Sequence, residues 1–298
     1  MDSVDYQRIL QVFRTDSPAR DGALPEGDKW ITTDLERVFA GKEATKSVLG
    51  IDIYRYSSYA PEQQRVIPAL FRYLYEAASD FCVKQESFLF QAQALREQFI
   101  PTGDGGFQIV DTPLHALVLA IYLQSNIEAF NGYLVFSRLR RILGPLRLRY
   151  AVTLDSVFRL DSNYFGSAII NNARILARDT LNRFLVDAAT VEWFQSLIGS
   201  IESLQLLTRE ELFRLAPFRD YREADAQCSL FPEAASGQQT ALRTIHLQHI
   251  GHVGAKRSVL EVFNLHVQVI VRRAAEDGSS TPRLMISLGN LNVGGISD

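Results

Sequence analysis

Two aspartates, Asp52 and Asp104, each follow the kind of sequence that ends a strand. Asp52 closes an apolar run at about 47–53 and precedes a polar turn. Asp104 lies in a Gly-Asp-Gly-Gly turn between the two halves of a predicted hairpin at about 98–110. If the two strands are neighbours, the carboxylates can share hard cations, because oxygen ligands suit Mg²⁺ or Mn²⁺. The sequence therefore predicts a divalent-metal site of the kind that accompanies nucleotide phosphates.

The elements around these aspartates predict an α+β domain in which helices flank one sheet. The helix after the first strand is marked by Ser57, Ser58 and Pro61, residue types that favour helix starts, and its apolar positions recur at helical spacing. The expected elements after the hairpin are a helix opening at 111–113, a strand at 146–152, a helix from Gly166 to about 182, a strand at 184–186, a helix at 190–203, a polar loop at 216–241, and strands at 244–249, 259–271 and 284–288.

The composition is that of a globular protein, with 47% hydrophobic residues and a net charge of −3, which argues against general nucleic-acid binding. Cys82 and Cys228 are too few for a disulfide framework or a thiolate metal site. The acidic start lacks a signal-peptide pattern, and the apolar run 114–123 is about half a bilayer span, so we expect a buried helix and a cytoplasmic protein.

Four segments in this order resemble the catalytic domain of class III adenylate and guanylate cyclases. The first two are the strand carrying Asp52 and the hairpin carrying Asp104. The third, Gly-Ser-Ala-Ile-Ile-Asn-Asn-Ala-Arg-Ile at 166–175, is similar to the family's helix with its glycine and arginine at the same separation. The fourth, at 250–256 and followed by Val262-Phe263, is similar to the strand with a phosphate-binding lysine. The resemblance covers roughly 47–270.

The resemblance implies a ferredoxin-like βαββαβ core and a C-terminal antiparallel β extension. We expect an N-terminal arm over 1–45, the catalytic domain over 46–272, and the extension over 273–298 packed on that domain. The family's two metals, Mg²⁺ or Mn²⁺, would be held by Asp52, the carbonyl of Ile53 and Asp104, and they stabilise both the attacking and the leaving oxygen.

The same resemblance assigns residues to the nucleotide. Arg174 would stabilise developing phosphoryl charge, and Lys256 would bind the β- and γ-phosphates as a point charge. The turn after Asp52 would lie beside the nucleotide, with anion-binding donors from Ser57 and the following helix start. Arg55 and Tyr56 replace the family's usual Gly-Phe and add bulk there. The nucleotide-binding residues expected in this turn are Tyr54, Arg55, Tyr56 and Ser57.

Three positions depart from the purine cyclases. Ile100 and Asn163 stand where those enzymes read the base, and an isoleucine cannot hydrogen-bond a purine edge. Ile170 stands where the family has a transition-state asparagine four residues before the arginine. Asn171, three residues before Arg174, shares roughly the same helical face and is the candidate to replace it.

Intact metal aspartates with altered base readers resemble the bacterial pyrimidine cyclases of the Pycsar anti-phage systems. That resemblance implies that UTP or CTP is converted to cyclic UMP or cyclic CMP, which activates a separate effector. The amide of Asn163 can face either pyrimidine, so the base stays open, and family grounds alone favour UTP.

The family works as head-to-tail homodimers with composite sites, so we expect a homodimer that binds neither nucleic acid nor membrane. Turn and cap chemistry is the alternative explanation for Asp52 and Asp104. A degenerate nucleotide sensor or scaffold with the cyclase fold is the rival function, favoured by Ile100 and Ile170. A diguanylate-type relative is more remote, because the hairpin lacks the Gly-Gly-Asp-Glu-Phe motif.

Overall fold

A computed structural model describes residues 38–221, 228–236, 240–254, 259–272 and 283–296, together with residues 3–5, 7, 9 and 36. Most of the expected arm at 1–45 lies outside the described residues, and so does Lys256.

The elements follow one another along the chain as a mixture of long helices and strands joined by short turns. Their bounds are β1 (Ser3–Val4), β2 (Glu43–Ile53), η1 (Tyr56–Ser58), α3 (Pro61–Gln85), α4 (Ala92–Glu97), β3 (Phe99–Pro101), β4 (Gly105–Val110), α5 (Pro113–Gly132), η2 (Leu134–Phe136), α6 (Ser137–Leu143), β5 (Leu148–Leu160), β6 (Asn163–Phe165), α7 (Ser167–Arg178), β7 (Phe184–Asp187), α8 (Ala188–Ile198), η3 (Glu202–Gln205), α9 (Arg209–Leu212), η4 (Ala216–Tyr221), η5 (Ala234–Ser236), β8 (Leu242–Gly254), β9 (Val259–Arg272) and β10 (Arg283–Leu288).

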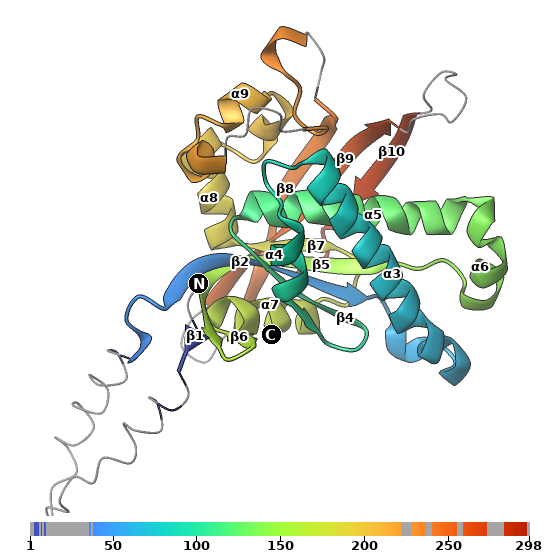
Figure 1. Ribbon diagram of the computed structural model, residues 1–298. Coiled ribbons are helices and arrows are strands. Elements are labelled where there is room, and N and C mark those ends of the chain that lie inside the picture. The colour runs from blue at the N-terminus through green and yellow to red at the C-terminus, as the bar shows by residue number, and fades with distance from the viewer. Residues whose placement is uncertain are drawn as a thin grey trace, which may run out of the picture.

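One mixed sheet runs through the molecule in the order β10-β9-β7-β5-β2-β4-β3, with β1 and β6 paired to β5 and β8 paired to β9 (Figure 1). Its first half is β2-α3-β3-β4-α5-β5, in which the strands lie in the order β5-β2-β4-β3 and all neighbours are antiparallel. This is the ferredoxin-like βαββαβ arrangement. The predicted α+β class is confirmed, and β10 adds an antiparallel strand to β9 near the C-terminus.

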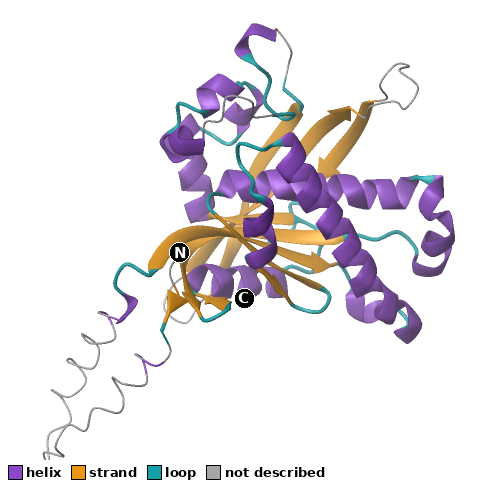
Figure 2. Ribbon diagram, viewed as in Figure 1, coloured by secondary structure: helices purple, strands orange, loops and turns teal. Residues whose placement is uncertain are grey.

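Side chains alternate between the two faces of β2 and bring different helices to each face. Leu49, Ile51 and Ile53 join the main core with residues of α3 and α5. Val48 packs with Ala168 of α7 on the other face, so the even-numbered residues of β2, Asp52 included, face the α7 side. Figure 2 shows the sheet between these helix layers.

Several predicted boundaries were wrong, and β5 differs most. It continues to Leu160 and returns through β6, where the sequence predicted a loop after 152. The polar residues of this stretch find partners in the fold; the hydroxyl of buried Thr153 donates to the Ala168 carbonyl at 2.8 Å. The helix predicted to reach about 182 ends at Arg178, and α4, α6 and β6 were not predicted.

The apolar run 114–123 is buried within α5, as predicted. None of the helices in the described ranges is long and apolar enough to cross a bilayer.

Candidate active site at the end of strands β2 and β4

Asp52 and Asp104 are brought together by the pairing of β2 with β4. Asp52 lies opposite Gly105 in the antiparallel register, and the amide of Ile53 donates to the Asp104 carbonyl at 3.1 Å. The strands are therefore neighbours, which is the condition under which the two carboxylates can share a cation.

Gly105 is what allows the hairpin to come this close to β2. A Cβ at this position would collide with the carbonyl oxygen of Ile51 on the facing strand. A side chain at Gly105 would push the hairpin away and separate Asp104 from Asp52. The close packing of the hairpin against β2 therefore requires a glycine next to Asp104, whatever the geometry of the turn.

Arg149 on β5 completes this end of the sheet, and the sequence did not identify it as a site residue. It pairs with Asp52 across the antiparallel register, and its Nε donates to the Asp52 carboxylate. Its Nη1 donates to the backbone carbonyl of Asp179, just after α7. The sequence showed it only as one of a basic cluster with Arg138, Arg140, Arg141 and Arg147, which could meet an anion or form a solvated face.

Burial and the charge of Arg149 shift the pKa of Asp52 in opposite directions. Burial raises the pKa of Asp52, the guanidinium of Arg149 acts in the opposite direction, and the negative charge of Asp104 raises that pKa further. Two neighbouring carboxylates that repel each other form a donor set that suits a hard cation, which would have to compete with Arg149 for Asp52. In the described ranges no three acidic, histidine or cysteine side chains surround one point, so further ligands must come from backbone, water or substrate.

The turn between β2 and α3 is compact and is held by its own contacts. Arg55 adopts a left-handed conformation, with φ 58° and ψ 36°, and its guanidinium lies 5.1 Å from the centre of the Tyr54 ring. The Tyr56 hydroxyl donates to the Gln64 carbonyl at 2.8 Å. Ser57 is exposed in η1.

The start of α3 differs in detail from the prediction. Pro61 opens the helix as expected, but the cap residue is Ala60, whose amide donates to Gln63 at 2.8 Å. Ser57 and Ser58 lie one short turn earlier, in η1, so neither caps α3. The predicted anion-binding donors of Ser57 and of the α3 start thus belong to two separate turns.

Arg174 and Asn171 lie together on α7 but belong to a different cluster from the aspartates. The Arg174 Nη1 donates to the Asn171 Oδ1 at 3.5 Å, and the Asn171 amide donates to Asp155 of β5 at 3.3 Å. Asp155 follows Arg149 by six residues, about 20 Å along a strand. In the described part of the chain Arg174 makes no hydrogen bond or ion pair with Asp52 or Asp104.

Asn172 anchors α7 to the sheet and was also missed by the sequence. Its side chain is fully buried, and the amide donates to the carbonyls of Val48 and Ala151 at 2.8 and 2.9 Å. A Cβ at Gly50 would collide with its side-chain oxygen. Gly50 and Asn172 together fix how closely α7 approaches β2.

The two expected base-reading residues differ in their surroundings. Ile100 is half-buried and packs in a small apolar cluster with Ile109 and Tyr164, the setting of a core residue. Asn163 is exposed and immediately precedes Tyr164 on β6. Ile170, at the family's asparagine position, is 52% exposed.

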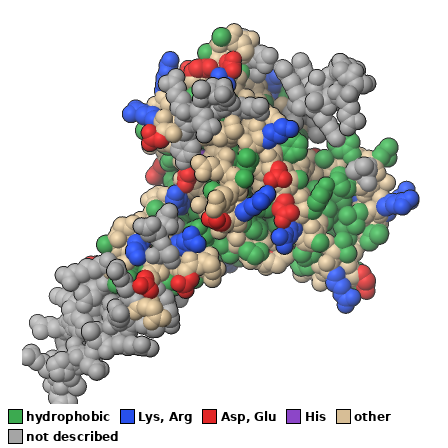
Figure 3. Space-filling model, in the orientation of Figure 1, with side chains coloured by type: hydrophobic (Ala, Val, Ile, Leu, Met, Phe, Trp, Pro, Cys, Tyr) green, Lys and Arg blue, Asp and Glu red, His purple; other side chains and the backbone are tan. Residues whose placement is uncertain are grey.

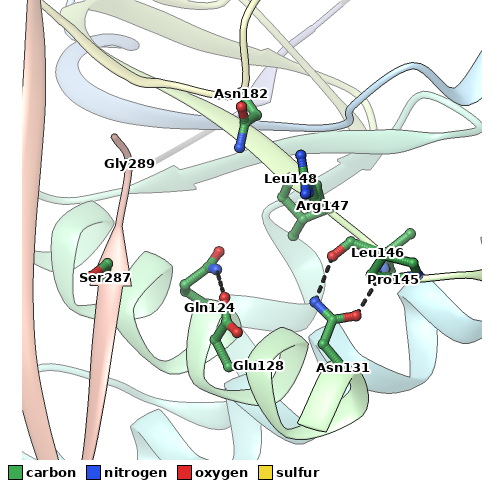
Figure 4. A pocket seen from close by; sticks show the side chains of 10 residues that line it. All are labelled: Gln124, Glu128, Asn131, Pro145, Leu146, Arg147, Leu148, Asn182, Ser287 and Gly289. Atoms are coloured by element: carbon green, nitrogen blue, oxygen red, sulfur yellow. Dashed lines mark hydrogen bonds between the residues drawn. The ribbon is translucent and has the colours of Figure 1, made fainter. Parts of the chain in front are cut away.

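A cavity of about 360 Å³ lies at the start of β5, and its lining does not include Asp52 or Asp104 (Figure 4). Much of its polar lining is already paired: Gln124 donates to Glu128 at 2.8 Å, and Asn131 exchanges two hydrogen bonds with the backbone of Leu146. The lining residues are Gln124, Glu128, Asn131, Pro145, Leu146, Arg147, Leu148, Asn182, Ser287 and Gly289.

Comparison with known proteins returned no matching family model and no matching curated protein. Similar solved structures include the adenylyl cyclase CyaB from P. aeruginosa, at 11% identity and TM-score 0.42, covering 75% of this chain and 95% of that one. An adenylate/guanylate cyclase/hydrolase from Silicibacter pomeroyi has 13% identity and TM-score 0.40, covering 76% and 98%. The guanylate cyclase domain of RhGC from Catenaria anguillulae, solved with GTP, has 11% identity and TM-score 0.41, covering 76% and 98%.

Proposed function

We propose that this protein is a nucleotidyl cyclase that converts UTP, or CTP, to 3′,5′-cyclic UMP, or cyclic CMP, and pyrophosphate. The observation that carries the proposal is that Asp52 pairs with Gly105, while the Ile53 amide donates to the carbonyl of Asp104, so the two aspartates lie on adjoining strand ends. We assign the chemistry to a catalytic domain over 46–272, flanked by the arm at 1–45 and the extension at 273–298, and acting in the cytoplasm.

The proposed reaction is an intramolecular phosphoryl transfer. The 3′-hydroxyl oxygen bonds to the α-phosphorus and loses its proton, the bond from that phosphorus to the bridging oxygen breaks, and pyrophosphate leaves. Asp52, the Ile53 carbonyl and Asp104 are the residues that would hold two Mg²⁺ or Mn²⁺ ions. When bound, such ions neutralise the triphosphate and stabilise the attacking and leaving oxygens.

A composite site in a homodimer is supported by the partners of Arg174, which in the described residues do not include Asp52 or Asp104. Asn171 donates to Asp155, which lies about 20 Å along β5 from Arg149, and Arg174 donates to Asn171. A second copy would supply Arg174, and Lys256, to the nucleotide held at Asp52 of the first. Arg174 would then stabilise negative charge on the transferring phosphoryl group, and Asn171 would orient it.

The pyrimidine preference rests on the two base-reading positions. Ile100 packs among apolar side chains and offers no hydrogen bond to a purine edge. The exposed amide of Asn163 has one donor and one acceptor group, so it suits uracil or cytosine. We favour uridylate cyclase, whose product would activate a separate effector in bacterial anti-phage defence.

A nucleotide sensor or scaffold without turnover is the second candidate. The amide of Asn171 is already bonded to Asp155, and Ile170 offers no hydrogen-bond donor in its place. The ion pair between Arg149 and Asp52 also occupies one of the two metal carboxylates. These contacts favour a site that binds without reacting.

Incubation of the purified full chain with Mn²⁺ and each of the four ribonucleoside triphosphates, followed by mass spectrometry, tests the proposal. We expect a cyclic pyrimidine monophosphate and pyrophosphate. A cyclic purine product would contradict the roles given to Ile100 and Asn163. If the protein binds nucleotide but yields no product from any triphosphate, the result would favour the sensor over the cyclase.

The matched control is Asp104→Asn, which removes a charge from the hairpin turn and retains its size. We expect this variant to fold and to lose turnover. Undiminished turnover would contradict the assignment of Asp104 as a ligand of the two metal ions.

A further inference from the structure

One end of the molecule combines exposed apolar side chains with arginines. Leu134 is 86% exposed, Ile142 62% and Tyr133 38%, and Arg138 and Arg141 between them are also exposed. These five residues form what we call the apolar–basic tip, which joins the end of α5 to η2 and α6. Figure 1 places α6 at the right-hand end of the molecule, and Figure 3 shows hydrophobic side chains gathered over that end.

The stretch of chain that contains the tip has a charge opposite to that of the whole chain. Residues 131–154 contain five arginines and no acidic residue, whereas the protein carries a net charge of −3. Two of those arginines have structural partners: Arg149 binds Asp52, and Arg140 donates to the carbonyls of Phe130 and Tyr133 at 2.7 and 3.0 Å. Arg138 and Arg141 have no ion-pair partner within the described ranges, so their charge faces solvent.

The tip is held in place from behind. Leu143 is buried, the rings of Phe130 and Phe136 pack at 5.7 Å, and Gln63 of α3 donates to the Ile142 carbonyl at 2.6 Å. Leu134 and Ile142 thus project from a fixed framework, although the core does not use them. Apolar side chains held outward in this way mark an interaction surface.

We infer that the apolar–basic tip docks on an anionic lipid surface. Leu134 and Ile142 would enter the boundary between headgroups and acyl chains, and Tyr133 would lie at headgroup level. Arg138 and Arg141 would meet the lipid phosphates. The inference departs from the sequence-based expectation that no membrane is involved, and it does not depend on whether the protein is a cyclase or a sensor.

A second copy of this chain fits the tip less well. Two tips that face each other would bring arginines of both copies together, and like charges repel. The proposed composite site also uses α7 and the Asp52 face of the sheet, whereas α3 and α5, which support the tip, cover the opposite face. An anionic surface satisfies both the apolar and the basic residues.

The test is flotation of the full-length protein with phosphatidylcholine vesicles, with and without phosphatidylglycerol. We expect binding only to the anionic vesicles, and weaker binding at high salt, because salt screens exposed charges. Equal recovery with both kinds of vesicle, or recovery with neither, would overturn the proposal.

Two double variants locate the contact. Leu134→Ser with Ile142→Ser, and Arg138→Glu with Arg141→Glu, should each lower the vesicle-bound fraction by about tenfold or more. The matched control is Leu206→Ser with Arg219→Glu, which changes exposed residues of the same types elsewhere, and it should bind like the wild type. Wild-type binding by both tip variants would overturn the proposal, as would a change in oligomeric state without a change in vesicle binding.

A fluorescent probe keeps the proposal testable if a double variant misfolds. A solvatochromic dye attached to Leu134→Cys should shift to shorter wavelength on anionic vesicles, whereas the same dye on Leu206→Cys should not. If the emission of the dye at Leu134→Cys stays at the wavelength seen in water, with and without anionic vesicles, the result would contradict insertion of the tip.

Discussion

Arg149 gives Asp52 a positive partner within the protein itself, on the neighbouring strand. Both side chains are about four-fifths buried, so this pair is better shielded from water than an exposed salt bridge. The arrangement lets Asp52 stay near Asp104 when no other cation is bound. A divalent ion would compete with Arg149 for the same carboxylate.

The first prediction follows from that competition. Without divalent ions, Arg149→Gln should lower the free energy of unfolding by about 1–3 kcal/mol, because Asp52 is left without a counter-charge beside Asp104. Addition of Mn²⁺ should then raise the melting temperature of the variant more than that of the wild type. Arg72→Gln, which breaks the exposed pair with Glu76, is the control and should show no such difference. Equal Mn²⁺ shifts in all three proteins would contradict this account.

Gly105 carries the second prediction. Gly105→Ala should destabilise the protein by about 1–3 kcal/mol, because the added methyl group meets the Ile51 carbonyl and the hairpin must move. Urea unfolding measures this directly. Gly132→Ala is the matched control, since nothing lies within 4 Å of its added Cβ, and it should leave stability unchanged or slightly higher. A tolerated alanine at Gly105 would mean that the hairpin does not need this close approach.

At the scale of elements, a buried carboxylate ties the segment after α9 to the core helices. Glu86, which follows α3, is fully buried and accepts hydrogen bonds from the amides of Ser229 and Leu230 and from the hydroxyl of Tyr122 on α5. Burial raises the pKa of Glu86 to about 7, although its hydrogen bonds act in the opposite direction. The group therefore titrates near neutral pH.

The third prediction concerns how the titration of Glu86 changes stability with pH. The folded protein holds the Glu86 proton between about pH 4.5 and 7, where the unfolded chain has lost it, so stability falls as the pH rises through this range. Glu86→Gln removes the cost of an ionised buried carboxylate. At pH 8 the variant should be more stable than the wild type, by on the order of 3 kcal/mol, and at pH 4 the two should be nearly equal.

Urea titrations at the two pH values measure the difference. Glu76→Gln, an exposed carboxylate on the same helix, should match the wild type at both. A constant difference between wild type and Glu86→Gln across the pH range would contradict a raised pKa.

The sequence predicted the elements whose patterns are local and strong. Alternation and apolar runs predicted β2, β4 and β9, and Pro61 and Pro113 marked the first turns of α3 and α5. It failed where tertiary contacts override local preference. The stretch after Val152 is a strand because it pairs with β2 as far as Phe158, Thr153 finds a partner on α7, and β6 pairs back onto β5.

The candidate site was predictable in part for the same reason. Asp52 and Asp104 stand in short motifs, so their meeting could be expected once their strands were assumed to be neighbours. Arg149 depends on the pairing of β5 with β2, and Asp155 and Asn172 on how α7 lies across the sheet. None of those three has a local signature, because their partners are distant in sequence.

At the scale of the whole molecule, one chain holds its candidate site residues in two places. Asp52 and Asp104 lie at the adjoining ends of β2 and β4, whereas on α7 Asn171 contacts Asp155 and Arg174 contacts Asn171. We therefore propose a functional centre built from two copies, in which α7 of one copy supplies Arg174 to the aspartates of the other. Such a dimer has two equivalent centres.

The measurement that tests this account most directly mixes two inactive variants, Asp104→Asn and Arg174→Ala, after each has been shown to fold and to form wild-type oligomers. Random exchange of subunits should restore about a quarter of the wild-type cyclic pyrimidine nucleotide production, because half of the dimers would carry one intact site of two. A mixture that stays inactive, while wild-type protein mixed in the same way stays active, would contradict a site shared between two chains.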